Sequence, residues 1–226
     1  MLGNVLYINC LDQAAVLADV MGDTDKAESY RETAATAREA WNEFFIDPDT
    51  GKTKNIKGEI QDTQASYATP LRFHVVSDEN LENVLENYNA TIAEASGEDS
   101  DGMPIVPYTL TTGFNATGNL LNALSDYGLN DTAYKLFEST DYASWLYPVT
   151  QGATSIWERW NGYTNELGFN GNNSMNSFNH YSLGAVYEWM VAYQLGIKSD
   201  ETQQMELVAG TYHFEVTDGN VTVTAA

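Results

Sequence analysis

Apolar residues recur at spacings of three and four along most of this 226-residue chain. The clearest run lies between positions 27 and 44, and its members are Ala27, Tyr30, Ala34, Ala37, Trp41 and Phe44. This spacing places the side chains on one face of an α-helix, so it predicts an amphipathic helix that buries one stripe. A chain dominated by this pattern folds as packed helices, because half-buried strands require alternation with a period of two.

The same reasoning divides most of the chain into helices joined by short connections, which are typical of antiparallel helical hairpins. The first helix is predicted to end near Gly22 and to bury Leu6, Tyr7, Leu11, Ala14, Ala15 and Ala18. Asp23 or Thr24 is expected to cap the second helix, and Asp62 the third. The later helices are expected over residues 63–75, from 78 to the loop that begins at Glu94, and over 115–127, 131–139 and 177–195. Trp41 and Trp189 follow helical stripes and are expected in the core.

Two regions lack this helical period. Residues 140–175 are polar, aromatic and glycine-containing, and connections of this length are usually functional. Residues 205–223 alternate as strands do, with Asp218-Gly219 as a hairpin turn. Asp99, in an acidic loop, is expected to be a solvated charge. The pattern therefore predicts a mainly α fold with a short β appendage; a bundle, a solenoid or a closed α/α barrel all fit it.

Composition excludes several partners and cofactors. The chain has 32 acidic and 10 basic residues, a net charge of −22, so nucleic acid and anionic membrane surfaces are not expected partners. No apolar run approaches the roughly 20 residues of a membrane span, and no signal-peptide pattern occurs, which leaves the compartment undetermined. Cys10 is the only cysteine, and His74 and His213 have no ligand-type neighbours, so neither a metal site nor another cofactor is predicted.

The candidate site lies in the aperiodic region. Glu158 stands between Trp157 and Trp160 and beside Arg159. Aromatic faces pack against the apolar face of a sugar ring, and a carboxylate can accept a proton from water. The alternative for Glu158 and Arg159 is a structural ion pair. The alternative for Trp157 and Trp160 is packing in the core, and the same two interpretations apply to Trp145.

His180 follows about twenty residues later, in a run of Asn and Ser that includes Asn179. Its imidazole can hydrogen-bond a sugar hydroxyl or assist a proton transfer. A lone histidine at the start of a helix is also often a structural group with its hydrogen bonds satisfied.

These segments resemble the C-terminal part of the catalytic domain of α-L-rhamnosidases, glycoside hydrolase family 78. The resemblance covers roughly residues 4–197 and is strongest in Gly152-Ala153-Thr154-Ser155-Ile156-Trp157-Glu158-Arg159-Trp160. It continues in Met175-Asn176-Ser177-Phe178-Asn179-His180-Tyr181-Ser182-Leu183-Gly184-Ala185-Val186 and in Thr112-Gly113-Phe114-Asn115-Ala116-Thr117. Gln64-Ala65-Ser66-Tyr67-Ala68 is a weaker match.

The resemblance implies part of an (α/α)6 barrel over residues 1–198 and the remnant of a β-sandwich over 199–226. It further implies a bacterial inverting hydrolase of terminal α-L-rhamnose, with Glu158 as general base. His180, Trp157, Trp160, Arg159 and Asn179 would bind the substrate, a rhamnose-containing glycoside or polysaccharide.

In this family the general acid belongs to an earlier segment of the barrel, so this chain is expected to lack it. The chain is accordingly expected to be inactive or weakly active alone. It is also expected to self-associate or to require that segment, because part of a barrel exposes apolar helix faces. A non-catalytic carbohydrate-binding or structural remnant, and an α/α-barrel enzyme acting on another sugar, are the alternatives.

Overall fold

The structure, a computed structural model of the chain, describes residues 1–100, 102–169 and 176–197, together with the backbone of 212–217 and 220–225. Three helical hairpins come first: α1 (Leu2–Val20) with α2 (Thr24–Phe45), α3 (Gln64–Arg72) with α4 (Asp78–Ala93), and α5 (Phe114–Asp126) with α6 (Asn130–Phe137). The single turn α7 (Tyr147–Thr150) and a helical stretch made of η1 (Ser182–Ala185), α8 (Val186–Trp189) and η2 (Met190–Gln194) follow. The prediction of a mainly α chain built from hairpins is confirmed.

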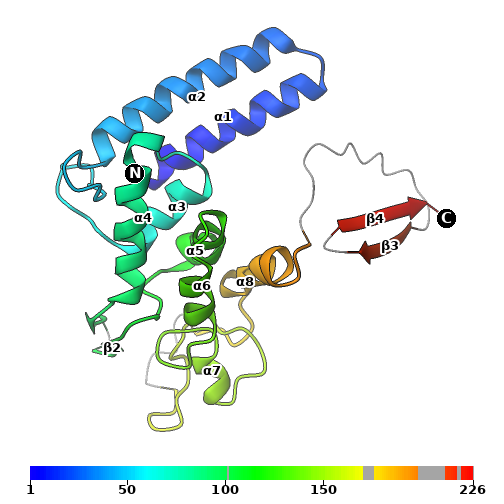
Figure 1. The fold of residues 1–226 in the computed structure, drawn as a ribbon. Coiled ribbons are helices and arrows are strands. Elements are labelled where there is room, and N and C mark those ends of the chain that lie inside the picture. The colour runs from blue at the N-terminus through cyan, green and yellow to red at the C-terminus, as the bar shows by residue number, and fades with distance from the viewer. Residues whose placement is uncertain (101, 170–175, 198–211, 218–219, 226) are drawn as a thin grey trace.

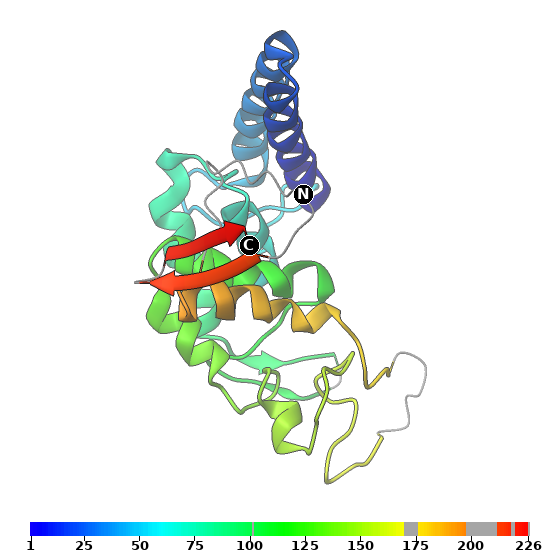
Figure 2. The same cartoon turned by 90° about the vertical axis from the view of Figure 1, so that its right-hand side faces the viewer.

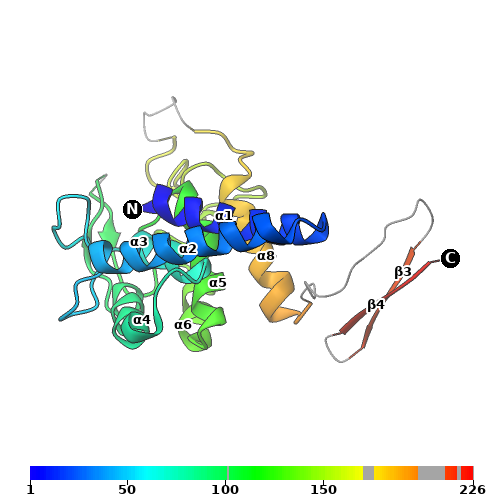
Figure 3. The same cartoon turned by 90° about the horizontal axis from the view of Figure 1, so that it is seen from above.

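One helix of each hairpin belongs to a row of neighbouring helices, and the other helix of the hairpin packs against that row. Within the row, α1 contacts α3, α3 contacts α5, and α5 contacts η1 and α8, while α2, α4 and α6 each pack on their hairpin partner. The α1–α2 hairpin projects beyond the other helices (Figures 1 and 2) and lies across them when seen from above (Figure 3). Trp41 and Trp189 are both fully buried, as predicted. None of the described helices is both long and apolar enough to cross a membrane.

Local chemistry explains several of the helix ends. Gly22 has a φ of 77°, the left-handed conformation that commonly ends a helix at glycine. The Asp23 side chain then accepts a hydrogen bond from Lys26 N at 3.2 Å and caps α2, as predicted. The bond to the Lys26 ammonium, followed by this backbone bond, lowers the pKa of Asp23.

The cap of α3 was predicted wrongly. Thr63, not Asp62, is the N-cap: its hydroxyl accepts from Ser66 N, and the Ser66 hydroxyl accepts from Thr63 N, which forms a capping box. Asp62 instead binds Lys52 and Tyr67, two groups that come together only in the folded chain.

The buried face of α1 was predicted correctly only in part. Ala15 and Ala18 are buried as expected, but Leu6 and Tyr7 are 48% and 53% exposed, and Val5 and Ile8 are buried in their place. Apolar residues occur on every side of this helix, so periodicity alone could not identify the stripe that packs against α2 and α3.

The last predicted helix begins five residues late and is not a regular α-helix. Residues 177–181, which were predicted to be helical, lie before its first turn. The helical stretch itself consists of a 3-10 turn, then one α turn, then a π turn. The residues before it are not helical because 177 and 180 form backbone hydrogen bonds with 158 and 156.

Short strands complete the fold. β1 (Gly97–Glu98) pairs with β2 (Pro104–Ile105) inside the predicted acidic loop. Asp99, expected to be a solvated charge, is half-buried there and accepts hydrogen bonds from Met103 N and the Tyr142 hydroxyl. β3 (Tyr212–Thr217) pairs with β4 (Asn220–Ala225) in antiparallel register, which confirms the predicted pair of terminal strands. The rest of that prediction, residues 205–211 and the turn at Asp218-Gly219, lies outside the described residues.

Candidate functional site

Two loop segments that are far apart in sequence run side by side at the candidate site. Glu158 N donates to Ser177 O at 2.9 Å, and His180 N donates to Ile156 O at 2.8 Å. The Ser155 hydroxyl donates to the Phe178 carbonyl in the same ladder. These bonds bring Glu158 and His180 together, although about twenty residues separate them.

The pairing also holds the carboxylate of Glu158. Its Oε2 accepts a hydrogen bond from Ser177 N at 2.8 Å, so the side chain and the backbone of Glu158 both bind the same residue. The side chain is half-buried. No described residue donates to Oε1, which leaves one oxygen of an oriented carboxylate able to bind water.

His180 is fixed between two aromatic rings. Its imidazole stacks on Phe114, with centroids 4.6 Å apart, and on Tyr181, at 5.3 Å. Ser182 N donates to its Nδ1 at 3.3 Å, so in the neutral ring the proton lies on Nε2, which can donate to a ligand. His180 lines a cavity of about 390 Å³ with Phe114, Asn115, Tyr181, Ser182 and Ala185.

The predicted indoles divide into packed and accessible rings. Trp157 is only 7% exposed and packs edge-on against Phe178, with centroids 5.0 Å apart, which leaves little of its surface for a sugar. Trp145 is buried and donates from Nε1 to Leu183 O. Trp160 is half-buried, packs edge-on against Trp145 at 6.0 Å, and lines a second cavity of about 380 Å³.

The two remaining predicted site residues lie in the same loops. Arg159, which follows Glu158 in the sequence, is half-buried. Asn179 is exposed, and its backbone N donates to the Ser177 hydroxyl at 3.2 Å. Asn179 therefore presents its side chain to solvent next to His180.

Sequence reasoning missed the contribution of the residues at the start of α5 and just before it. Thr112 lines the cavity of Trp160, and Phe114, two residues later, lines the cavity of His180. Both belong to a motif quoted above, but nothing in a linear pattern shows that two residues so close in sequence line two different cavities. Among the described residues, no three His, Cys, Asp or Glu side chains gather as a metal site would require.

Comparisons with known proteins agree with this architecture. Residues 1–193 match the family model of the bacterial alpha-L-rhamnosidase 6 hairpin glycosidase domain. An alpha-L-rhamnosidase of Formosa agariphila is 34% identical over 197 residues, which are 87% of this chain and 19% of that protein. One from Streptomyces avermitilis is 34% identical over 84% of this chain and 16% of that protein.

Solved structures give the same result. The crystal structure of Streptomyces avermitilis alpha-L-rhamnosidase complexed with L-rhamnose aligns with a TM-score of 0.69 and 32% identity, over 86% of this chain and 17% of that one. The alpha-L-rhamnosidase of Aspergillus terreus aligns with a TM-score of 0.69 and 27% identity, over 82% of this chain and 19% of that one. The chain thus spans less than a fifth of the length of these relatives.

Proposed function

Because this chain belongs to the family of bacterial α-L-rhamnosidase six-hairpin glycosidase domains, we propose that it forms the general-base part of an enzyme that removes terminal α-L-rhamnose from glycosides. The observation that carries the proposal is the pairing of 155–158 with 177–180. It orients the Glu158 carboxylate through Ser177 N, and it joins the loop of Glu158 to the loop of His180, which itself lines a cavity.

In this proposal Glu158 takes a proton from water through Oε1, while Ser177 N holds Oε2. The activated water attacks the anomeric carbon as the glycosidic C–O bond breaks and the leaving oxygen takes a proton from a general acid, so the configuration at that carbon inverts. His180 donates from Nε2 to a sugar hydroxyl, and Trp160 offers an indole face to the apolar side of a ring. Ground-state recognition and proton abstraction are then separate tasks of separate side chains.

Inverting hydrolysis requires a second, protonated carboxyl about 6.5–9.5 Å from the base. The proposal assigns this general acid to a part of the family's barrel that precedes the segment matched here. We therefore expect the chain by itself to hydrolyse aryl rhamnosides slowly or not at all.

Binding tests the proposal without requiring turnover. In an amide NMR titration, L-rhamnose should shift the signals of Glu158, Ser177 and His180. His180→Ala should weaken binding about five-fold, as expected for one lost hydrogen bond. Glu158→Gln should change affinity less than about two-fold, because the amide keeps an oxygen that accepts from Ser177 N. Signals unmoved at these three residues would contradict the proposal.

Turnover separates the roles further. Any hydrolysis of an aryl rhamnoside by the chain should fall at least about 100-fold in Glu158→Gln, the usual contribution of a general base. Rapid hydrolysis that this change abolishes would mean that another carboxyl of the chain supplies the acid. Tight rhamnose binding that leaves the signals of Glu158 and Ser177 unmoved, with no turnover that Glu158→Gln lowers, would instead favour a carbohydrate-binding role.

A further inference from the structure

The cavity of Trp160 does not stand alone. Ile105 and Thr111 line it, and the same two residues line another cavity, of about 410 Å³, on the side toward Lys52. Each cavity has a volume in the usual range of ligand pockets, about 300–1,000 Å³. The two are therefore adjacent, one before α5 and the other before α3.

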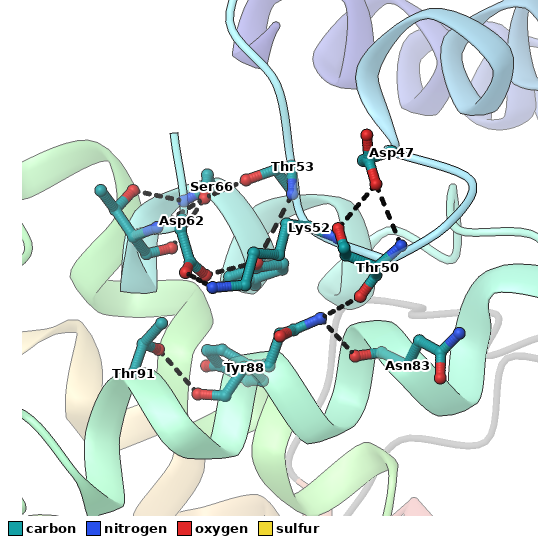
Figure 4. A network of polar contacts seen from close by, with 12 residues as sticks. Asp47, Thr50, Lys52, Thr53, Asp62, Ser66, Asn83, Tyr88 and Thr91 are labelled. Carbon is teal, nitrogen blue, oxygen red and sulfur yellow. Dashed lines mark hydrogen bonds and ion pairs between the residues drawn. The ribbon is translucent and has the colours of Figure 1, made fainter. Parts of the chain in front are cut away.

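The far cavity is polar and held in place by hydrogen bonds. Lys52 Nζ lies 2.5 Å from Asp62 Oδ2, and the Tyr67 hydroxyl donates to Asp62 Oδ1 at 2.6 Å; Figure 4 shows this network. Asp62 has a φ of 29°, which is uncommon outside glycine and persists where surrounding contacts hold it. Burial, followed by the bond to Asp62, raises the pKa of Tyr67, so the phenol stays a donor. Glu94 adds an exposed carboxylate to the wall.

The near cavity combines aromatic and polar groups. Trp160 and Tyr142 supply rings, and Thr111 and Thr112 supply hydroxyls. Among the described residues that line the two cavities, three carry a carboxylate (Asp62, Glu94 and Asp99) and one, Lys52, carries an ammonium group. The lining is therefore negatively charged on balance. An uncharged ligand with many hydroxyls and an apolar ring face fits this lining better than an anion does.

We propose that the two cavities form one groove, running from Trp160 past Thr111 to Lys52 and Asp62, that binds neutral sugar units on the leaving-group side of a rhamnoside. The inference rests on the proposed function and extends it: the preferred ligands are rhamnosyl oligosaccharides rather than rhamnose alone.

The test is a titration of the ¹⁵N-labelled chain with L-rhamnose, with glucose and with a rhamnosyl-glucose disaccharide. The disaccharide should bind about five-fold more tightly than rhamnose, the gain from one added hydrogen bond. It should also shift the amides of Thr111 and Asp62, which rhamnose leaves unchanged. Thr111→Tyr, which fills the junction, should remove the difference between the two sugars, and Thr36→Tyr on α2 should preserve it.

A second variant avoids adding bulk. Glu94→Gln, just after α4, should weaken binding of the disaccharide about three-fold through loss of a charged acceptor, whereas Glu86→Gln, on α4 and outside the cavity, should have no effect. A disaccharide that binds no more tightly than rhamnose, or a gain that survives Thr111→Tyr, would overturn the groove.

The two proposals fail in different ways. Shifts at Glu158 and His180 without any at Thr111 would leave the proposed function standing and remove the groove. Shifts at Thr111 and Asp62 with the disaccharide or glucose, without any rhamnose effect at Glu158, would support a sugar-binding groove and contradict the proposed function. No shift from any of the sugars would overturn both.

Discussion

Single residues decide how tightly the segments of this chain meet. Gly51 closes the turn after α2 with a φ of 69°, and its N donates to Asp47 O at 2.8 Å. A Cβ at this position would lie 2.4 Å from the Cβ of Asn83 on α4. This turn is therefore also a point of close packing between the segment after α2 and α4, which only the folded chain shows.

Gly51→Ala should destabilise the chain by about 3 kcal/mol, because it adds backbone strain to a steric clash. Gly58 is a matched control: its φ is 80°, but nothing lies within 4 Å of a Cβ there. Gly58→Ala should cost only about 1 kcal/mol, from strain alone. Equal losses for both variants in urea denaturation would show that the contact with Asn83 does not matter.

At the scale of elements, one buried amide ties three segments together. Gln64, the first residue of α3, donates from Nε2 to Thr91 O on α4 at 3.1 Å and to Thr109 O at 2.8 Å. Its Oε1 accepts from Thr111 N at 2.9 Å. These bonds hold the end of α4 and the segment before α5 against α3, and so shape the wall of the proposed groove.

Gln64→Leu should destabilise the chain by about 2–4 kcal/mol, because it leaves buried backbone groups without partners. The exposed Gln61, three residues earlier, gives the matched control: Gln61→Leu should change stability by less than about 0.5 kcal/mol. Thermal denaturation compares the two. A neutral effect of Gln64→Leu would mean that water replaces the amide.

At the scale of the molecule, the projecting α1–α2 hairpin leaves apolar side chains in solvent. The large exposed ones on α1 and just after it are Leu6, Tyr7, Val16, Leu17, Val20 and Met21. An apolar surface of this kind commonly binds another surface. Copies of the chain repel one another because each carries a net charge of −22, and this repulsion weakens as the salt concentration rises and screens the charges.

We expect the chain to self-associate, more strongly at 0.5 M than at 0.05 M salt, as screening lengths shorten from roughly 14 to 4 Å. Leu17→Glu should shift sedimentation toward monomer, because it places a charge on the apolar surface. Thr36→Glu adds the same charge to the exposed side of α2 and should not. A monomer under all these conditions would refute the expectation.

The sequence by itself determined the helical hairpins, the end of the first helix near Gly22, the pairing of two terminal strands and the residues of the family motifs, because these depend on spacing and local chemistry. It did not determine which face of α1 is buried, that Thr63 rather than Asp62 caps α3, or that residues 177–181 leave the helical path. Each of these depends on a partner distant in sequence: α3 for α1, Lys52 and Tyr67 for Asp62, and residues 156–158 for 177–180. The division between packed Trp157 and cavity-lining Trp160 has the same origin, since two indoles of one loop acquire different surroundings only when the loops pack.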